Sequence, residues 1–318
     1  MSVSVVLALG LITLIQTTWT AFAQTYERID PATDLQYLGA FRMPSNLSDV
    51  RGYGLTFHPG GNGGQGSLFI VQGHVNASIG YGTAEISIPA PVNSRSSASL
   101  NRATLLQPLT NITKTGTGKT DQFGDVSYLP RQGSQTTDKL YWTAYQYYGA
   151  SGDDYLSLGW AELNFSVPNI QGPWHIGSSG IVHLNKTGKY AFEADHTWAD
   201  TYVDGKYLLV GRHREAGGQG GSQGPTLYAV APWTQGNPPA QGANIPDVTL
   251  LEYAAAGSPT TFPDYQPNDT QNDGVWIKAG SKHAVLFVGR KASSNCYGEA
   301  SACGDPCNNS KGYHGYPY

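Results

Sequence analysis

The stretch "DVSYLPRQGSQTTDKLYWTAYQ", residues 125–146, decides the fold. Two short apolar and aromatic runs flank a polar segment rich in Gly, Ser, Thr and Asp, a pattern that predicts two antiparallel strands joined by a turn. Runs that resemble the second of these strands recur about every 70 residues, as expected of a structural repeat. They begin at Ser67 ("SLFIVQGH"), Lys139 ("KLYWTAYQ"), Lys206 ("KYLLVGRH") and Ala284 ("AVLFVGRK").

A first strand is predicted ahead of each of these runs. It begins with Asp or Gly and carries an aromatic residue three positions later: "GLTF" at Gly54, "DVSY" at Asp125, "DHTW" at Asp195 and "DGVW" at Asp273. Three units continue into a third run, "TAEISIP", "LGWAELNFSVP" and "TLYAVAPW", which ends at or near a proline, as an outer strand can. The aromatic residues of the first strands are predicted to lie in the core between units; they are Phe57, Tyr128, Trp198 and Trp276.

These repeats predict an all-β protein. Helical periodicity is nearly absent, and units of three or four antiparallel strands at a regular period are typical of a β-propeller. We expect a propeller of four visible repeats, with five blades in the complete protein and the strand at residues 35–44 completing the last blade. A large β-sandwich with coincidentally similar strands is the alternative.

The first 23 residues predict a secretory signal peptide, followed by a single propeller domain over residues 24–318 that is truncated at its C-terminus. The apolar run Val5–Ile15 is too short to span a bilayer, and "AFA" at 21–23 suits signal peptidase. Because no Lys or Arg precedes the run, an uncleaved anchor is the alternative. We expect a secreted, extracellular protein with no membrane contact after cleavage. A net charge of -4 without a basic run argues against a nucleic-acid partner.

Secretion carries two further expectations. The three cysteines predict one local disulfide with a leftover thiol, or a partner beyond the end of the sequence, because their spacing matches no common zinc site. The disulfide is one pair among Cys296, Cys303 and Cys307. Seven sequons predict N-glycosylation of surface loops, with ordinary Asn-rich loop composition as the alternative. They are Asn46, Asn76, Asn111, Asn164, Asn185, Asn268 and Asn308.

The repeat gathers polar residues at one end of the strands. In a propeller, the start of the first strand and the end of the second share a face, so Asp125, Asp195 and Asp273 are expected around one mouth of the channel. Polar residues of the second strands reach the same mouth: His74, Gln146, His213 and Lys291. We predict that Asp195, Asp273, Gln146 and Lys291 bind a ligand there.

Two histidines in this set are candidate metal ligands. His74 and His213 come from different repeats, and with Gln146 and a carboxylate they suit a divalent ion such as Mn²⁺ or Zn²⁺. Ca²⁺ held by the carboxylates is a second possibility. Surface histidines that bond to water are the alternative.

Glu193 and His196 differ from the other polar residues. In this alignment they occur in one unit alone, whereas Asp opens the first strand in three of four units. Since the repeated architecture does not require them, Glu193 and His196, together with Asp125, are the candidate catalytic residues. A local packing role is the alternative.

Three phrases carry a resemblance to known proteins. "LGAFRMP", "SLFIVQGH" and "AEISIP" resemble a set of uncharacterised secreted proteins, a likeness that brings no activity. At the level of fold, the acidic residues that open successive inner strands are similar to those of five-bladed glycosidases. That resemblance implies a second-blade carboxylate at Asp125 and a general acid at Glu193, but Gly54 stands where those enzymes have a base, with Asp49 the nearest carboxylate.

Three functions remain open. The first is binding of a glycan or protein ligand at the channel mouth. The second is a carbohydrate-active enzyme, either a hydrolase using Glu193 and Asp125 or a metal-dependent lyase using His74 and His213. The third is a structural or adhesive extracellular protein, including a self-assembling one. We rank binding first, because the carboxylate set is incomplete and no nucleophile elbow or HExxH helix is present.

Overall fold

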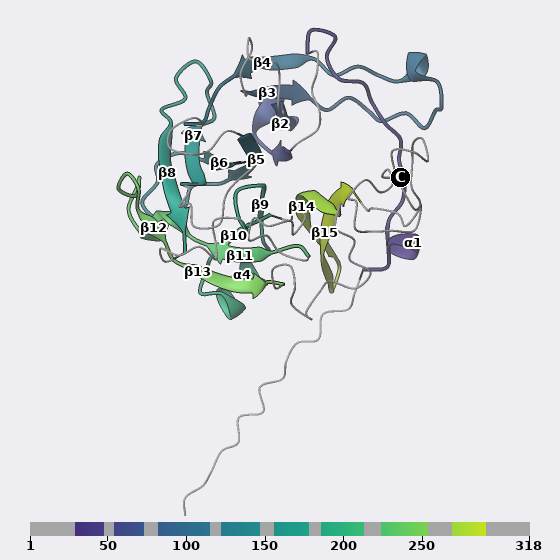
Figure 1. Ribbon diagram of the computed structural model, residues 1–318. Helices are drawn as coiled ribbons and strands as arrows, with labels where there is room; N and C mark the ends of the chain where they lie inside the picture. Colours follow the sequence, from purple (N-terminus) through teal and green to yellow (C-terminus); the bar gives the residue numbers. More distant parts are fainter. Residues whose placement is uncertain are drawn as a thin grey trace, which may run out of the picture.

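The computed structural model describes residues 29–47, 54–72, 82–114, 122–146, 156–177, 186–212, 224–253 and 269–290, and it is all-β (Figure 1). The strands form four sheets that follow one another along the chain. Sheet 1 contains β1 (Leu55–His58), β2 (Ser67–Gln72), β3 (Gly82–Ser87) and β4 (Leu105–Thr110). Sheet 2 contains β5 (Gln122–Leu129), β6 (Lys139–Tyr145), β7 (Leu158–Glu162) and β8 (Gln171–Ile176), with β12 (Asn244–Ile245) added parallel to β8. Sheet 3 contains β9 (Tyr190–Glu193), β10 (Leu208–Gly211), β11 (Leu227–Val230) and β13 (Asp247–Leu251), and sheet 4 contains β14 (Thr270–Ala279) and β15 (Lys282–Arg290).

The helices of the described residues are short; α1 precedes the first strand, and the others lie between strands. They are α1 (Pro31–Asp34), α2 (Gly61–Gly64), α4 (His196–Tyr202) and the 3₁₀ turns η1 (Ser97–Ser99) and η2 (Pro232–Thr234). No helix within the described ranges is long and apolar enough to cross a membrane.

The predicted repeat is confirmed in most of its strands. All four second strands form, as β2, β6, β10 and β15, and the three predicted third strands form as β3, β7 and β11. Within each sheet, neighbouring strands follow one another in the chain and pair antiparallel, except that β12, which lies between β11 and β13 in the sequence, joins sheet 2. The prediction of an all-β protein built from repeated antiparallel units is therefore confirmed.

One predicted first strand is wrong. "DHTW" is not a strand but the start of α4: Asp195 is the N-cap residue, and its Oδ1 accepts a hydrogen bond of 3.0 Å from the backbone N of Trp198. An Asp at this position satisfies an amide that a helix leaves without a partner, which favours a helix over a strand. The first strand of the third unit is instead β9. When the second strands of the units are aligned, the residue of β9 that occupies the position of Asp125 and Asp273 is Ala191, not Asp195.

The first strands of the four sheets pack against one another in the order β1, β5, β9, β14. These strands run in the same direction: residues later in one strand contact residues later in the next. Gly54 lies against Asp125, and two residues further along the chain the Thr56 hydroxyl accepts a hydrogen bond of 3.0 Å from the backbone N of Tyr128. Figure 1 shows the sheets in chain order around these inner strands.

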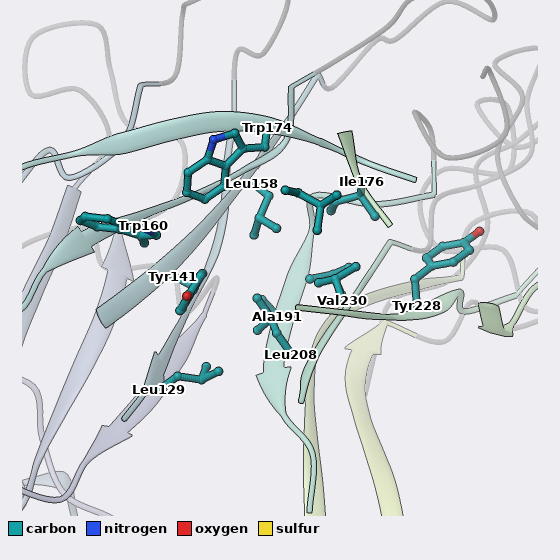
Figure 2. Close-up of a cluster of buried hydrophobic side chains, with 12 residues drawn as sticks. Leu129, Tyr141, Leu158, Trp160, Trp174, Ile176, Ala191, Leu208, Tyr228 and Val230 are labelled. Atoms are coloured by element: carbon teal, nitrogen blue, oxygen red, sulfur yellow. The ribbon is translucent and has the colours of Figure 1, made fainter. Parts of the chain in front are cut away.

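Apolar side chains fill the space between successive sheets. Phe69 of sheet 1 packs with Trp142 of sheet 2, and Trp276 of sheet 4 packs against the cluster that holds Phe192 of sheet 3. Figure 2 shows the cluster shared by sheets 2 and 3, which includes Tyr141 and Tyr228. Each of these interfaces removes large aromatic and aliphatic side chains from water, the dominant favourable contribution to folding.

The segment at residues 35–44 does not form the closing strand that its sequence predicts. It runs beside the sheets as a strap: Ala40 forms an isolated bridge with Val92, and Arg42 forms one with Arg102, both next to sheet 1. Just before it, Asp34 pairs with Lys282 of sheet 4 at 3.0 Å. The segment therefore links the fourth sheet to the first.

The aromatic residues that open the units are less buried than predicted. Phe57 is 52 % exposed, which contradicts a core position. Tyr128, Trp198 and Trp276 are half-buried and pack against the cores, with the Trp198 and Trp276 ring centroids 4.8 Å apart. Trp198 makes this contact from α4 instead of from a strand.

Several predictions fall outside the described residues. The signal peptide, the three cysteines, His74, His213 and Lys291 belong to these parts of the chain, as do the sequons at Asn76, Asn185, Asn268 and Asn308.

Candidate functional site

The inner strands carry two polar clusters at opposite ends. The axial cluster consists of Asp125, Asp273, Lys189 and Arg212. The Glu193 face lies where β1, β5 and β9 end, and consists of Glu193, His196, Tyr128, His58 and Glu85. The two clusters differ in exposure, and that difference decides what each can do.

Asp125 occupies the centre of the axial cluster and is 1 % exposed. Its Oδ1 accepts a hydrogen bond of 2.7 Å from the backbone N of Val126, and its Oδ2 accepts one of 3.0 Å from the backbone N of Ala191. Asp125 also shares a side-chain hydrogen bond with Asp273. A single carboxyl group thus joins β5 to β9 and β14.

Burial raises the pKa of Asp125 well above its ordinary value, and the charge of Asp273 raises it further. Burial also raises the pKa of Asp273. A hydrogen bond between two carboxyl groups requires a proton on one of them, and two like charges in contact disfavour ionisation of both. We therefore assign one shared proton to the pair.

Two cations complete the axial cluster. Burial lowers the pKa of Lys189 to about 8, although the nearby Asp125 and Asp273 oppose this shift. Arg212 is 3 % exposed, donates a hydrogen bond of 3.0 Å from Nη2 to the carbonyl O of Gln146, and lies 4.6 Å from the ring centroid of Tyr145. Gln146 therefore lies beside Arg212, at the edge of the axial cluster.

The shared proton makes folding stability depend on pH. Because the folded-state pKa of Asp125 is raised, its contribution is complete below the ordinary value of 3.8 and is lost as the pH rises through the raised value. We expect the free energy of unfolding of wild type relative to Asp125→Asn to fall from acidic to neutral pH, since the amide cannot ionise. Urea titrations of both proteins across this pH range measure the difference. A difference that stays constant with pH would contradict the shared proton.

The Glu193 face is partly open to solvent. Glu193 Oε1 lies 2.7 Å from His196 Nε2, and the two side chains are 35 % and 43 % exposed. Partial burial raises the pKa of Glu193, and the hydrogen bond and charge of His196 oppose that rise. The structure therefore brings these two candidate residues into direct contact.

Local structure explains why the pair forms. β9 ends at Glu193, and α4 begins at His196 after the Asp195 cap, so the turn between them brings both side chains together. The His196 ring stacks on Tyr207 with centroids 3.9 Å apart and planes at 15°. Tyr207 stacks in turn on Trp233 at 5.9 Å and 16°. The imidazole therefore stands on a rigid aromatic stack.

Residues from sheets 1 and 2 extend this face. The negative charge of Glu193 contributes to a raised pKa of Tyr128, whose main cause is burial, and the Tyr128 hydroxyl donates a hydrogen bond of 2.7 Å to Asp138 Oδ2. The Tyr128 ring centroid lies 5.2 Å from that of His58. His58 Nδ1 is 2.9 Å from Glu85 Oε1, so a buried carboxylate holds the second imidazole in place.

Sequence reasoning missed His58, Glu85 and Lys189. Glu85 is buried, and besides His58 it accepts hydrogen bonds from the Ser67 hydroxyl and, at 2.6 Å, from Gln107 Nε2. The signal was present: a single Glu inside the otherwise uncharged strand "TAEISIP" requires partners if it is buried. Ser67 and Glu85 both approach the same nitrogen of His58, Nδ1, and Ser67 also donates to Glu85. In the Ser–His–acid relay of a hydrolase the serine and the acid contact different imidazole nitrogens, so this network is not such a relay.

Other predicted site residues are separated from these clusters or from one another. Asp195 caps α4 and pairs with Lys278 at 2.7 Å, which holds its pKa below the ordinary value. Asp125 is buried at the start of the inner strands, whereas Glu193 ends β9 two residues beyond the amide that Asp125 binds. Asp125 and Glu193 therefore do not share an open pocket. Among the residues that the structure describes, no group of three or more His, Cys, Asp or Glu side chains is placed to hold a metal ion.

Comparison with known proteins adds no assignment: no family model matches the chain, and neither the curated proteins nor the solved structures yield a match.

Proposed function

We propose that this chain is a secreted, N-glycosylated β-propeller that binds a glycan or another polar extracellular ligand at the Glu193 face. The observation that carries the proposal is the partly exposed Glu193–His196 pair, held at 2.7 Å on the stack formed by Tyr207 and Trp233. A carboxylate accepts hydrogen bonds from sugar hydroxyls and an imidazole N–H donates to them, and the rigid support lowers the entropy lost on binding.

The propeller part of the proposal rests on the inner strands. Four antiparallel sheets succeed one another in chain order, and their first strands pack side by side in the same direction. Each pair of successive sheets shares an apolar core. Radial repetition of such sheets is the architecture of a propeller. The expected fifth blade rests on sequence outside the described residues and stays a prediction.

The extracellular part of the proposal is supported by the three sequons that the structure describes. Asn46, Asn111 and Asn164 are all exposed. Asn111 Oδ1 accepts hydrogen bonds from the backbone N and the hydroxyl of Thr113, and Asn164 Oδ1 accepts one from the backbone N of Ser166. Both sequons therefore lie in exposed turns that leave room for a glycan. Mass spectrometry of the protein from a glycosylating host tests their occupancy.

Binding is preferred to catalysis because a two-carboxylate hydrolase needs both groups beside the substrate, at separations of roughly 5 to 10 Å. Asp125 is buried in the axial cluster, where its oxygens bind two backbone amides and Asp273. The glycosidase resemblance pairs Glu193 with this residue, and its burial removes it from any substrate at the Glu193 face. The lyase alternative depends on His74 and His213, which lie outside the described residues.

The test is a screen of plant, fungal and microbial glycans on an array, followed by calorimetry on the ligands found. We expect Glu193→Gln and His196→Ala each to weaken binding by about tenfold or more, the equivalent of losing one hydrogen bond to a charged group. Asp204→Asn is the matched control, because Asp204 is an exposed carboxylate shortly after α4 whose lysine partner lies 3.7 Å away. Unchanged affinity in Glu193→Gln would contradict the site, and cleavage of a bound glycan by wild type but not by Glu193→Gln would assign catalysis instead.

A further inference from the structure

His58 gives the Glu193 face a second imidazole, on a different strand from His196. β1 ends at His58, and the His58 ring stacks on Phe69 with centroids 5.3 Å apart and planes at 16°. The centroid of the Tyr128 ring lies 5.2 Å from that of His58. The His58 side chain is 15 % exposed. The imidazole is therefore held against two aromatic rings and still reaches solvent.

A buried carboxylate fixes which nitrogen of His58 carries the proton. The Glu85 side chain is 7 % exposed, and its two oxygens accept hydrogen bonds from the Ser67 hydroxyl and, at 2.6 Å, from Gln107 Nε2. With both oxygens accepting, Glu85 acts as an ionised carboxylate, which has acceptors alone. His58 Nδ1, at 2.9 Å from Glu85 Oε1, is therefore the donor. In a neutral imidazole with its proton on Nδ1, the other nitrogen, Nε2, is an acceptor.

This acceptor, His58 Nε2, has no hydrogen-bond partner among the described residues. The turn that follows β1 passes beside it without a side chain, because a Cβ at Gly60 would lie 3.4 Å from Nε2. Gly61 packs so closely on Ser67 and Glu85 that a Cβ there would overlap the Ser67 hydroxyl. The turn thus closes over the carboxylate and leaves Nε2 without a partner. A polar atom held in one orientation in this way is suited to a hydrogen-bond donor from a ligand.

Tyr128 lies between His58 and the Glu193–His196 pair. β5, which carries Tyr128, packs between β1 and β9. The Tyr128 hydroxyl is bound by Asp138 Oδ2 at 2.7 Å, which fixes the ring. His58 ends β1 on one side of this ring, and Glu193 ends β9 on the other. A ligand that contacts both must extend across Tyr128, as a chain of sugar units does.

The charges of the face disfavour an anionic ligand. Glu193 is paired with His196, and Asp138 accepts hydrogen bonds from the Tyr128 hydroxyl and the backbone N of Arg131. Within the part of the chain that the structure describes, neither carboxylate bonds to a Lys or Arg side chain. A sulfate or carboxylate group on a ligand would therefore meet charges of its own sign.

We propose that the ligand of the Glu193 face is a neutral oligosaccharide of two or more units that crosses Tyr128, an inference that rests on the proposed glycan binding. One unit bonds to Glu193 and His196, and another donates a hydroxyl hydrogen bond to His58 Nε2. Hydroxyl donors are present on every unit of a neutral glycan, and a nitrogen without a proton accepts from them. His58 is thus the residue that makes the site select a chain over a single sugar.

The test is calorimetry with neutral cello-, xylo-, manno- and chito-oligosaccharides of one to six units, beside oligogalacturonates as an acidic series. We expect a neutral series to bind about tenfold tighter or more once its members reach His58, the equivalent of one added hydrogen bond. His58→Asn should cancel this gain and leave the affinity for the monosaccharide unchanged. The asparagine NH₂ replaces the Nδ1 donor toward Glu85, and nothing replaces Nε2.

Two controls separate binding by His58 from a structural role. His196→Ala should weaken members of every length, since its partner Glu193 binds the first unit, and thermal unfolding of each variant shows that it folds. Nitrogen-15 NMR of histidine-labelled protein, well above the ordinary histidine pKa of about 6.5, reads the tautomer without any ligand. We expect the proton of His58 on Nδ1, with the signal identified by its loss in His58→Asn. A proton on Nε2 would remove the acceptor and overturn the proposal.

The binding results also distinguish this proposal from the proposed function. Equal affinity for all lengths, or a His58→Asn variant that keeps the gain with length, would show that the ligand does not reach His58, although the Glu193 site would stand. Tighter binding of the acidic series would overturn the neutral ligand and leave glycan binding in place. Absence of binding in every series would overturn both.

Discussion

Asp125→Ala is expected to lower the free energy of unfolding by about 3 to 5 kcal/mol, the usual cost of breaking a buried ionic network by removing one partner. The substitution leaves the backbone N–H groups of Val126 and Ala191 without their acceptor and removes the hydrogen bond to Asp273. It also removes one of the carboxylates that oppose the buried charges of Lys189 and Arg212. Urea unfolding followed by tryptophan fluorescence and circular dichroism measures the loss.

Asp125→Asn separates the role of the hydrogen bonds from that of the charge. An asparagine amide keeps one oxygen for an N–H donor and places an NH₂ group where the protonated acid donates, so it resembles the protonated form of Asp125. We expect a loss of about 1 kcal/mol at acidic pH, well below that of the alanine variant. Asp204→Asn, at an exposed carboxylate whose φ of 54° an asparagine also tolerates, should stay within about 0.5 kcal/mol of wild type. An alanine variant at position 125 as stable as this control would contradict the role of Asp125 as the link between inner strands.

The strands are predictable where the sequence alternates or runs apolar between turn residues. "SLFIVQGH", "KLYWTAYQ" and "AVLFVGRK" all correspond to observed strands, because local patterning and burial agree in these segments. "DHTW" misleads because Asp opens strands in two other units, whereas here the same residue caps a helix. Local composition does not distinguish the two, as both use an Asp carboxylate to satisfy a backbone N–H.

The alignment of the "DHTW" segment with the other units decides which residues are expected in the axial cluster. Matching Asp195 to Asp125 and Asp273 predicts a ring of three carboxylates, but the true counterpart is Ala191, whose amide binds Asp125. The observed register matches Glu193 with Thr56, Ser127 and Val275, none of which is acidic. Glu193 therefore remains an acidic residue that one unit alone provides.

Contacts between distant elements could not be read from the sequence. The face that joins Glu193 to Tyr128 and His58 depends on how β1, β5 and β9 pack side by side, and no spacing within the chain specifies that arrangement. The same is true of Lys189 and Arg212, which approach the ring of Tyr145 from another sheet. Periodicity predicts which residues share a face of a strand, but not which strand faces it.

Gly54→Ala is expected to lower the free energy of unfolding by about 3 kcal/mol, at the upper end of the usual cost of overpacking. A Cβ at this position would overlap Asp125 Oδ1 and lie 3.1 Å from Asp125 Cα, so both the side chain and the backbone of β5 obstruct it. Asp125 has no free direction in which to move, because its two oxygens are fixed by the amides of Val126 and Ala191. Gly60→Ala is the matched control, since Gly60 has φ -81° and its Cβ would come no closer than 3.4 Å to His58.

The same variant also tests whether β1 and the carboxyl pair form one unit. If the added Cβ at position 54 displaces Asp125 from Asp273, the proton is no longer shared, and the stability of Gly54→Ala should depend on pH less steeply than that of wild type. A loss of stability with an unchanged pH dependence would mean that the strand moves and the carboxyl pair stays intact. A variant as stable as Gly60→Ala would contradict the close approach of β1 to β5, and with it the arrangement of inner strands on which both polar clusters depend.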